Sequence, residues 1–539
     1  RSFKFCPLIV QKGGETSAIR AAFMHRNVDD WEQAERHVLA YPRARVEEFS
    51  PYSKAILEIR SEQDLRVLQK IYANGVLLGD QSERGWGIKY AREFDMTNDS
   101  KLFPPRPKWE DKGYQPDEYG HWLKGPWRDY HGPQHILDRE PGLVLSRDGR
   151  QALHMDDIQD VALPLYEGRM IGQFDFSEKG WVSGKGRSAV WRDIPFEEKV
   201  VEPQYMAALA DVAESPKCNM NPKIAYMRIG SATNSRTAIS SFLDVYPAGD
   251  SVFFYRPHVR SYSTSVAVST NLNSLAYDYH LRNRVGGLNL SEFIMDETSV
   301  VSPATIHSHP RLIAYVAGLL LGSPAQAHAL RSLFNEMPVL KEALSKRSWR
   351  HGWAVSSHER LRRRAILDAV YAHLYNLSVE EIAFIMRGCD LPTGSHGDTR
   401  YSTLIDPKGF WRIDKDKDPE LRHTVLSLVA FHDLQEKSLE AFMAQNDGEG
   451  WLIPEYLRLA DYGLGHDDRA QVHQPVASRL GPRFYDWQLS EDVERSWQEC
   501  AAHAELIRRI VPLPEASEAA SVAEEPASYT ADFTQGALF

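Results

Sequence analysis

One turn of the sequence gathers side chains that can contact a polyanion. The segment "RIGSATNSRT" places Arg228, Thr233, Asn234 and Arg236 between two apolar runs. Arginine and asparagine can form paired hydrogen bonds with the edges of guanine and adenine, and hydroxyl groups bind phosphate oxygens. These residue types favour a loop that reads nucleic acid, with Asn234 and Arg236 as the base readers. A hydrated hairpin loop without a ligand explains the same pattern equally well.

The segment "VSGKGRSAVWR" has a similar character. It sets Lys185 and Arg187 among glycines, close to Trp181 and Trp191. Glycine lets a backbone approach a phosphate closely, and aromatic rings beside basic side chains suit base stacking. Lys185 and Arg187 are therefore predicted to contact phosphates, with a plain loop edge as the alternative.

A third segment, "LPLYEGRMIGQFDF" at 163–176, mixes charged and apolar residues densely. Glu167, Arg169, Gln173 and Asp175 stand among side chains that favour a core. One interpretation is a strand and turn at a domain edge. The other is a surface that binds something polar, with Arg169 as the contact. Because acidic side chains repel phosphate, Glu167 and Asp175 would then position Arg169 or accept a hydrogen bond from a cytosine amine.

Motifs for common catalytic chemistry are absent. The sequence contains no G-x-x-x-x-G-K-[ST], no G-x-G-x-x-G after a strand, no H-E-x-x-H and no G-x-S-x-G. His307 and His309 lie two residues apart without an apparent cysteine or carboxylate partner, which favours a polar loop over a metal site. No catalytic, cofactor-binding or metal-binding residue is assigned.

Composition limits the class of protein. A chain of 539 residues exceeds what one core accommodates, so roughly two to four domains are expected. The apolar share of 42% and charged share of 25% are typical of a soluble globular protein, and no apolar run is long enough to span a bilayer. The dispersed cysteines suit a reducing cytoplasm. The net charge of −11 argues against a non-specific polyanion binder, although residues 341–364 are locally basic.

Local patterns predict the elements that must hold these segments. Residues 1–45 contain a buried-strand pattern, "FKFCPLIV", a second strand, "AIRAAFMHR", and a helix from about Asp29. A strand, "AILEIR", precedes a helix that begins after the N-cap Ser61 and ends at Gly75. Residues 104–150 are rich in proline, tryptophan, tyrosine and glycine, which predicts a long ordered loop or a linker with little regular structure.

Residues 151–320 read as short strands with polar turns, followed by helical patterns to about residue 511. The predicted strands include "IAYMRIGSATNSRT", "SVFFYRPHVR" and "STSVAVST", and a helix follows in "NLNSLAYDYHLRNRVGG". Four later segments show helical spacing of apolar residues: "ERLRRRAILDAVYAHLYNL", "SVEEIAFIMRG", "ELRHTVLSLVAFHDLQEKSLEAFMAQ" and "SEDVERSWQECAAHAELIRRIV". The acidic tail at 512–539 has little to bury and is expected to be disordered. The sequence opens inside a strand pattern without an initiator Met, which indicates a piece of a longer protein.

An ordered series of sequence blocks resembles a known family. The blocks are, in order, "RSFKFCPLIV", "SPYSKAILEIRSEQDLRVLQKIY", "DMTNDSKLF", "LPLYEGRMIGQFDF", "RIGSATNSRTAISSFLDVYP", "NLNSLAYDYHLRNRVGGLNLSEFIMDETSVV" and "RAILDAVYAHLYNLSVEEIAFIM". Together they resemble the C-terminal half of large adenine-specific DNA methyltransferases of the type IIG restriction–modification kind, and of related phage-defence methylases. The resemblance spans nearly the whole chain.

The resemblance implies a multidomain fold of the α/β and α+β classes. It makes 1–45 the last strands of a Rossmann-like methyltransferase domain, 46–150 a connecting region, 151–320 a mixed α+β target recognition domain, and 321–511 a mainly helical domain before the tail at 512–539. Family members transfer a methyl group from S-adenosylmethionine to the exocyclic amine of a flipped adenine. Their Asn/Asp-Pro-Pro-Tyr/Phe motif and their glycine-rich cofactor turn do not occur in this sequence. We therefore expect both sites upstream of these residues, and an inactive isolated chain.

Double-stranded DNA is the expected partner, with other subunits of a restriction or defence system as further partners and no membrane. Two alternatives remain: a stand-alone DNA-binding specificity subunit that serves a separate methyltransferase, and a protein-interaction scaffold without a DNA role. The predicted DNA contacts are Arg169, Lys185, Arg187, Arg228, Thr233, Asn234 and Arg236.

Overall fold

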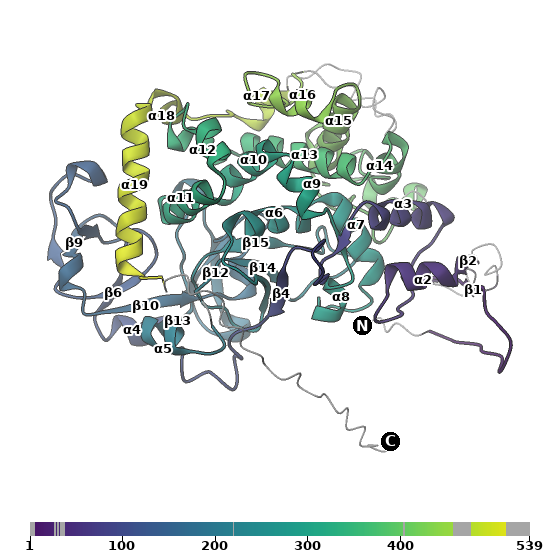
Figure 1. Cartoon of the computed structure of the whole chain (residues 1–539), viewed down its shortest axis with the longest axis horizontal. Helices are drawn as coiled ribbons and strands as arrows, with labels where there is room; N and C mark the ends of the chain where they lie inside the picture. Colours follow the sequence, from purple (N-terminus) through teal and green to yellow (C-terminus); the bar gives the residue numbers. More distant parts are fainter. Residues whose placement is uncertain are drawn as a thin grey trace.

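The central sheet of the molecule joins segments that lie far apart in the sequence. In the computed structural model, which describes residues 6–25, 29, 32, 38–218, 220–402, 405–455 and 476–513, this sheet has four antiparallel strands in the order β15-β14-β16-β4. The strands are β15 (Ser240–Leu243), β14 (Lys223–Met227), β16 (Val252–Pro257) and β4 (Ile88–Ala91). Figure 1 shows helices gathered on one side of this sheet and smaller sheets on the other, which is a mixed α+β architecture.

Helix α6 (Tyr262–Leu272) covers one face of the central sheet and corrects a sequence prediction. The segment "STSVAVST" within it was predicted to be a strand. The hydroxyl of Ser261 accepts a hydrogen bond from the N–H of Thr264 at the start of the helix, which satisfies a group that the first turn leaves unpaired. All but one of the residues of α6 are buried, so the sequence shows no amphipathic period that would have indicated a helix.

A second four-stranded sheet crosses the expected boundary at residue 150. Its order is β13-β10-β6-β5, so strands from 104–150 pair with strands from the following region. The prediction of little regular structure in 104–150 is therefore wrong. The elements of this region are α4 (Arg106–Glu110), β5 (Tyr114–Pro116), β6 (Trp122–Lys124), β7 (Arg128–Asp129), β8 (Leu143–Leu145), β9 (Gln151–His154), β10 (Asp160–Leu165) and β13 (Tyr205–Ala208).

The helices predicted beyond residue 320 are confirmed. They are α13 (Ser357–Leu374), α14 (Val379–Ile385), α15 (His423–Gln435), α16 (Leu439–Ala444) and α19 (Val493–Ile510). The basic run 341–364 is partly internal, because Arg362 and Arg363 both lie 2.6 Å from the carboxylate of the fully buried Glu359. Much of the charge in that run is thus used inside the fold.

The first part of the chain is built around a small hairpin and a capped helix. Strand β1 (Ala18–Ala21) pairs with β2 (Leu39–Pro42). Helix α3 (Glu62–Ala73) begins after Ser61, whose hydroxyl accepts from the N–H of Asp64, as predicted.

The chain ends and residues 55–60 depart from the sequence prediction or lie outside the described residues. Residues 6–12 form no strand and are exposed, and the expected strand at 55–60 is irregular. The helix from about Asp29 and the tail at 512–539 fall largely outside the described residues. No helix in the described part of the chain has both the length and the apolar character needed to cross a bilayer.

Candidate functional site

The recognition turn, defined as residues 231–237, lies between β14 and β15 and presents polar side chains outward. Thr233, Asn234 and Ser235 are exposed at its tip. Inside the turn, the hydroxyl of Thr237 donates to the carbonyl of Ser231 at 2.9 Å. The hydroxyls of Ser231 and Thr233 bond each other at 3.0 Å, so among the described residues the side chains of Asn234 and Ser235 remain without a partner at the tip.

Helix α7 (Leu275–Arg284) holds the recognition turn in place through hydrogen bonds to its backbone. The N–H groups of Thr237 and Ala238 both donate to the carboxylate of Asp278 at 3.1 Å. One turn further along α7, Arg282 donates to the carbonyl of Ser235 at 2.7 Å and to Asp278 at 3.3 Å. Because Asp278 and Arg282 are almost fully buried, these bonds are shielded from water and hold the turn in one shape.

Arg236 points inward, which corrects its assignment as a base reader. Its side chain is 8% exposed, and it donates to the carbonyl of Asn273 at 3.3 Å. The carboxylates of Asp278 and Asp368 each lie 3.9 Å from its guanidinium. An arginine flanked by two buried carboxylates is an internal anchor of the turn, and it presents no free edge to a base.

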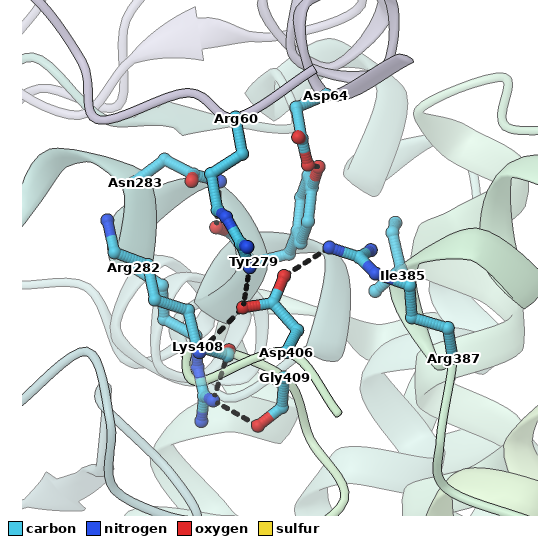
Figure 2. A pocket seen from close by; sticks show the side chains of 10 residues that line it. All are labelled: Arg60, Asp64, Tyr279, Arg282, Asn283, Ile385, Arg387, Asp406, Lys408 and Gly409. Atoms are coloured by element: carbon cyan, nitrogen blue, oxygen red, sulfur yellow. Dashed lines mark hydrogen bonds and ion pairs between the residues drawn. The ribbon is translucent and has the colours of Figure 1, made fainter. Parts of the chain in front are cut away.

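Arg282 also connects the turn to a small buried cavity (Figure 2). It donates to the carbonyls of Lys408 and Gly409 at 2.8 and 3.0 Å. Within the same cavity, the carboxylate of Asp406 pairs with Arg60 and with Arg387. The accessible space is about 10 Å³, which is the size of one water. Its position and size make this cluster a structural junction that fixes α7 rather than a ligand site.

Lys185 and Arg187 lie at the tip of a two-stranded hairpin formed by β11 (Lys179–Ser183) and β12 (Val190–Asp193). Both side chains are exposed, and neither pairs with an acidic group among the residues that the structure describes. Gly184 has φ +77°, and a Cβ there would lie 2.4 Å from the carbonyl of Ser188. Its own carbonyl accepts from the indole of Trp181 at 3.0 Å, so the hairpin tip is held in place.

Arg228 and Arg169 belong to neighbouring segments that meet at Ser251. The N–H of Gly168 donates to the Ser251 hydroxyl at 2.9 Å, and the N–H of Arg228 donates to its carbonyl at 3.1 Å. Arg169 is exposed, whereas Arg228 is partly exposed and pairs with Asp250 at 3.0 Å. Strand β11 packs on the short 3-10 helix Gly168–Met170, which carries Arg169. Whether the two loops present one face to DNA stays a prediction.

The polar residues of 163–176 are mostly structural. Asp175 forms a buried ion pair with Lys199 at 2.7 Å, and Gln173 donates to the carbonyl of Asn273 at 2.9 Å. Burial raises the pKa of Glu167 to about 7. The segment forms β10 and a turn, as the plainer interpretation proposed. Of its charged side chains, only that of Arg169 is exposed without an ion pair to another described residue.

Sequence reasoning missed an open pocket of about 420 Å³ beside Arg228. Its lining comes from four segments, which the pairing of β14 and β4 with β16 and the position of α8 (Glu292–Met295) bring together. No local pattern indicates this convergence, although the exposed Phe293 is an unusual residue for a surface helix. The lining residues are Tyr90, Arg228, Phe253, Asn289, Ser291, Glu292, Phe293 and Asp296.

Comparison of the chain with protein-family models and with curated proteins finds no match. His307, one of the paired histidines, packs its ring edge-on against Trp86 with 5.9 Å between ring centroids. Within the described ranges, no group of three or more histidine, cysteine or acidic side chains is arranged to hold a metal ion.

Proposed function

We propose that this chain is the DNA-recognition part of an adenine-specific DNA methyltransferase from a restriction–modification or phage-defence system. The observation that carries the proposal is the pair of unpaired cations, Lys185 and Arg187, on an anchored hairpin. Arg169 lies on the 3-10 helix that packs on strand β11 of this hairpin, and the recognition turn connects β14 and β15 of the central sheet. Rigid loops with free cations and free amide or hydroxyl groups suit phosphate positioning combined with base reading. The ordered blocks that resemble the family support the same assignment.

Methyl transfer is assigned to a segment or chain other than these 539 residues, because the amine-holding motif and the cofactor turn are absent here. In this proposal S-adenosylmethionine binds to that catalytic unit. The cell compartment that we propose is the cytoplasm, where DNA and the methyl donor are both present. An Asn-Pro-Pro-Tyr motif in frame upstream would favour the single-chain enzyme over a separate specificity subunit.

The experiment is a salt series of duplex binding, read by fluorescence anisotropy of a labelled mixed-sequence duplex. The double variant Lys185→Ala/Arg187→Ala should bind every sequence more weakly and lower the slope of log affinity against log salt by about two, one for each lost phosphate contact. Asn234→Ala, tested on a duplex selected from a random pool, should cost about 1–3 kcal/mol on that site only.

The matched control removes the same charge elsewhere. Arg66 on α3 and Lys437 after α15 are exposed and lie away from the hairpin, so Arg66→Ala/Lys437→Ala should leave the slope unchanged. Equal slopes for the two double variants, or no salt-dependent duplex binding by the parent chain, would contradict the proposal and favour the protein-interaction scaffold.

A further inference from the structure

The open pocket beside Arg228 has aromatic walls. Tyr90 and Phe253 meet edge to face at 5.4 Å between ring centroids, and they come from the paired strands β4 and β16. Phe293 on α8 is 65% exposed, a large apolar ring left in solvent at the pocket. A flat ligand could therefore stack on exposed aromatic surface that the fold itself leaves without cover.

The polar groups of the pocket are free to bind a ligand. In the part of the chain that the structure describes, the side chains of Asn289, Ser291 and Glu292 and the hydroxyl of Tyr90 make no hydrogen bond or ion pair. Burial raises the pKa of Tyr90 to about 12, so its hydroxyl remains a donor at neutral pH. The pocket thus offers donors from Tyr90 and Ser291, an acceptor from Glu292, and both from Asn289.

The charged groups that line the pocket are one cation, Arg228, and two carboxyls, Glu292 and Asp296. Arg228 is held by Asp250 at 3.0 Å, and its guanidinium lies 5.2 Å from the ring centre of Phe253. Burial raises the pKa of the Asp296 carboxyl, which accepts a hydrogen bond from Tyr255. With Arg228 already paired and two carboxyls in the lining, the pocket disfavours a free anion and suits a planar ligand with hydrogen-bonding edges.

We infer that this pocket binds a nucleobase, stacked on Phe293 and read at its edge by Asn289. Base stacking on an aromatic side chain tolerates all four bases, while an asparagine amide can pair with a base edge. The inference rests on the proposed function for the source of the base, which is a DNA strand whose base is unpaired or turned out of the helix. A free nucleoside has the same chemistry and is the other source.

Binding to single strands with and without bases tests the inference. The probes are a fluorescein-labelled 12-nucleotide DNA of mixed sequence and the same strand with abasic sites at its centre. The full chain should bind the first strand about 5–150-fold more tightly, the ratio that one stacked base supplies. Phe293→Ala and Asn289→Ala should each reduce this ratio. Both residues are exposed, so the variants should fold.

Leu288→Ala is the matched control. Leu288 is 61% exposed next to Asn289 but does not line the pocket, so its variant should keep the ratio. A second experiment measures binding of each of the four deoxynucleosides to the chain by saturation-transfer NMR in the absence of DNA. The parent chain should give a saturation-transfer signal, and Phe293→Ala should lose it. Nucleoside binding without strand binding would support the pocket with a free nucleoside as its source and would count against the DNA proposal.

Two results would overturn the inference. The first is that Phe293→Ala changes neither the ratio of affinities for the intact and abasic strands nor the nucleoside signals, whether or not the chain binds duplex DNA. The second is binding of N-acetylarginine amide that depends on Phe293 and Glu292, without nucleoside binding. That outcome would assign the pocket to a basic side chain of a protein partner.

Discussion

The recognition turn depends on Asp278, and the substitution Asp278→Asn tests that dependence. Two N–H groups of the chain, those of Thr237 and Ala238, donate to this buried carboxylate at 3.1 Å. Hydrogen bonds to a charged acceptor contribute about 1.5–3 kcal/mol each, about twice the contribution of neutral ones. Asparagine keeps the shape and one accepting oxygen but removes the charge. Opening of the turn should therefore become easier by about 1.5–3 kcal/mol for the two bonds together.

Hydrogen–deuterium exchange, followed by mass spectrometry on a peptide that covers 231–240, measures this opening. The expected change speeds exchange of the two amides about 10–150-fold, since 1.4 kcal/mol corresponds to a factor of ten. Asp250→Asn is the matched control, because that carboxylate pairs with Arg228 and not with the two amides. Native exchange of 231–240 in a folded Asp278→Asn protein would refute the view that α7 holds the turn.

Three further predictions concern the buried groups. Folding raises the pKa of Glu167 from 4.5 to about 7, so the protonated carboxyl stabilises the fold fully below pH 4.5 and this stabilisation is lost as pH rises through 7. The thermal midpoint of the parent protein should therefore fall between pH 4.5 and 7, and Glu167→Gln should make that fall smaller. Asp175→Ala should lower the free energy of unfolding by about 3–5 kcal/mol in denaturant titration, since it leaves Lys199 buried without its partner, and Asp175→Ala/Lys199→Met should recover much of the loss; equal stability of the two variants would contradict this. In the native protein at pH 8, iodoacetamide should modify the exposed Cys6 far faster than the other cysteines, as mass spectrometry would show, and rapid modification of all four would argue against the burial described. Burial raises the pKa of the other three thiols to about 12: Cys218, Cys389 and Cys500.

Elements with strong local signals were predictable from the sequence. Helix α19 carries apolar residues at helical spacing, α13 and α15 are long stretches without proline or glycine, and the cap at Ser61 is decided by residues three positions apart. Helix α6 was missed because burial around nearly its whole surface removes the amphipathic period, while its short run of threonine and valine is typical of a strand. Strands of two or three residues, such as β5, are too short to produce an alternating pattern, so the second sheet was missed as well.

The candidate site could be predicted only in part, because residue type does not fix direction. The sequence located Asn234 and Arg236 in one turn, but a carboxylate some forty residues further along, Asp278, helps to draw Arg236 inward while Asn234 stays exposed. The open pocket depends on four segments that meet only through tertiary contacts. Local pattern therefore identified a turn with the right chemistry, and long-range ion pairs decided which of its side chains are available.

The last described helix has a consequence for how the protein forms in the cell. The Tyr119 hydroxyl bonds Nδ1 of His503 at 2.8 Å, and the two residues are 384 positions apart in the chain. Helix α19 packs on α11 (Ala327–Glu336), and its His503 contacts Tyr119 in the turn between β5 and β6, so this turn lacks one of its neighbours until α19 has been synthesised. At about 5–20 residues per second, the ribosome needs roughly 20–80 s to cover this interval. During that time the residues that α19 will contact, including the Tyr119 ring, are exposed to solvent. We expect chaperones to bind a nascent chain in this state.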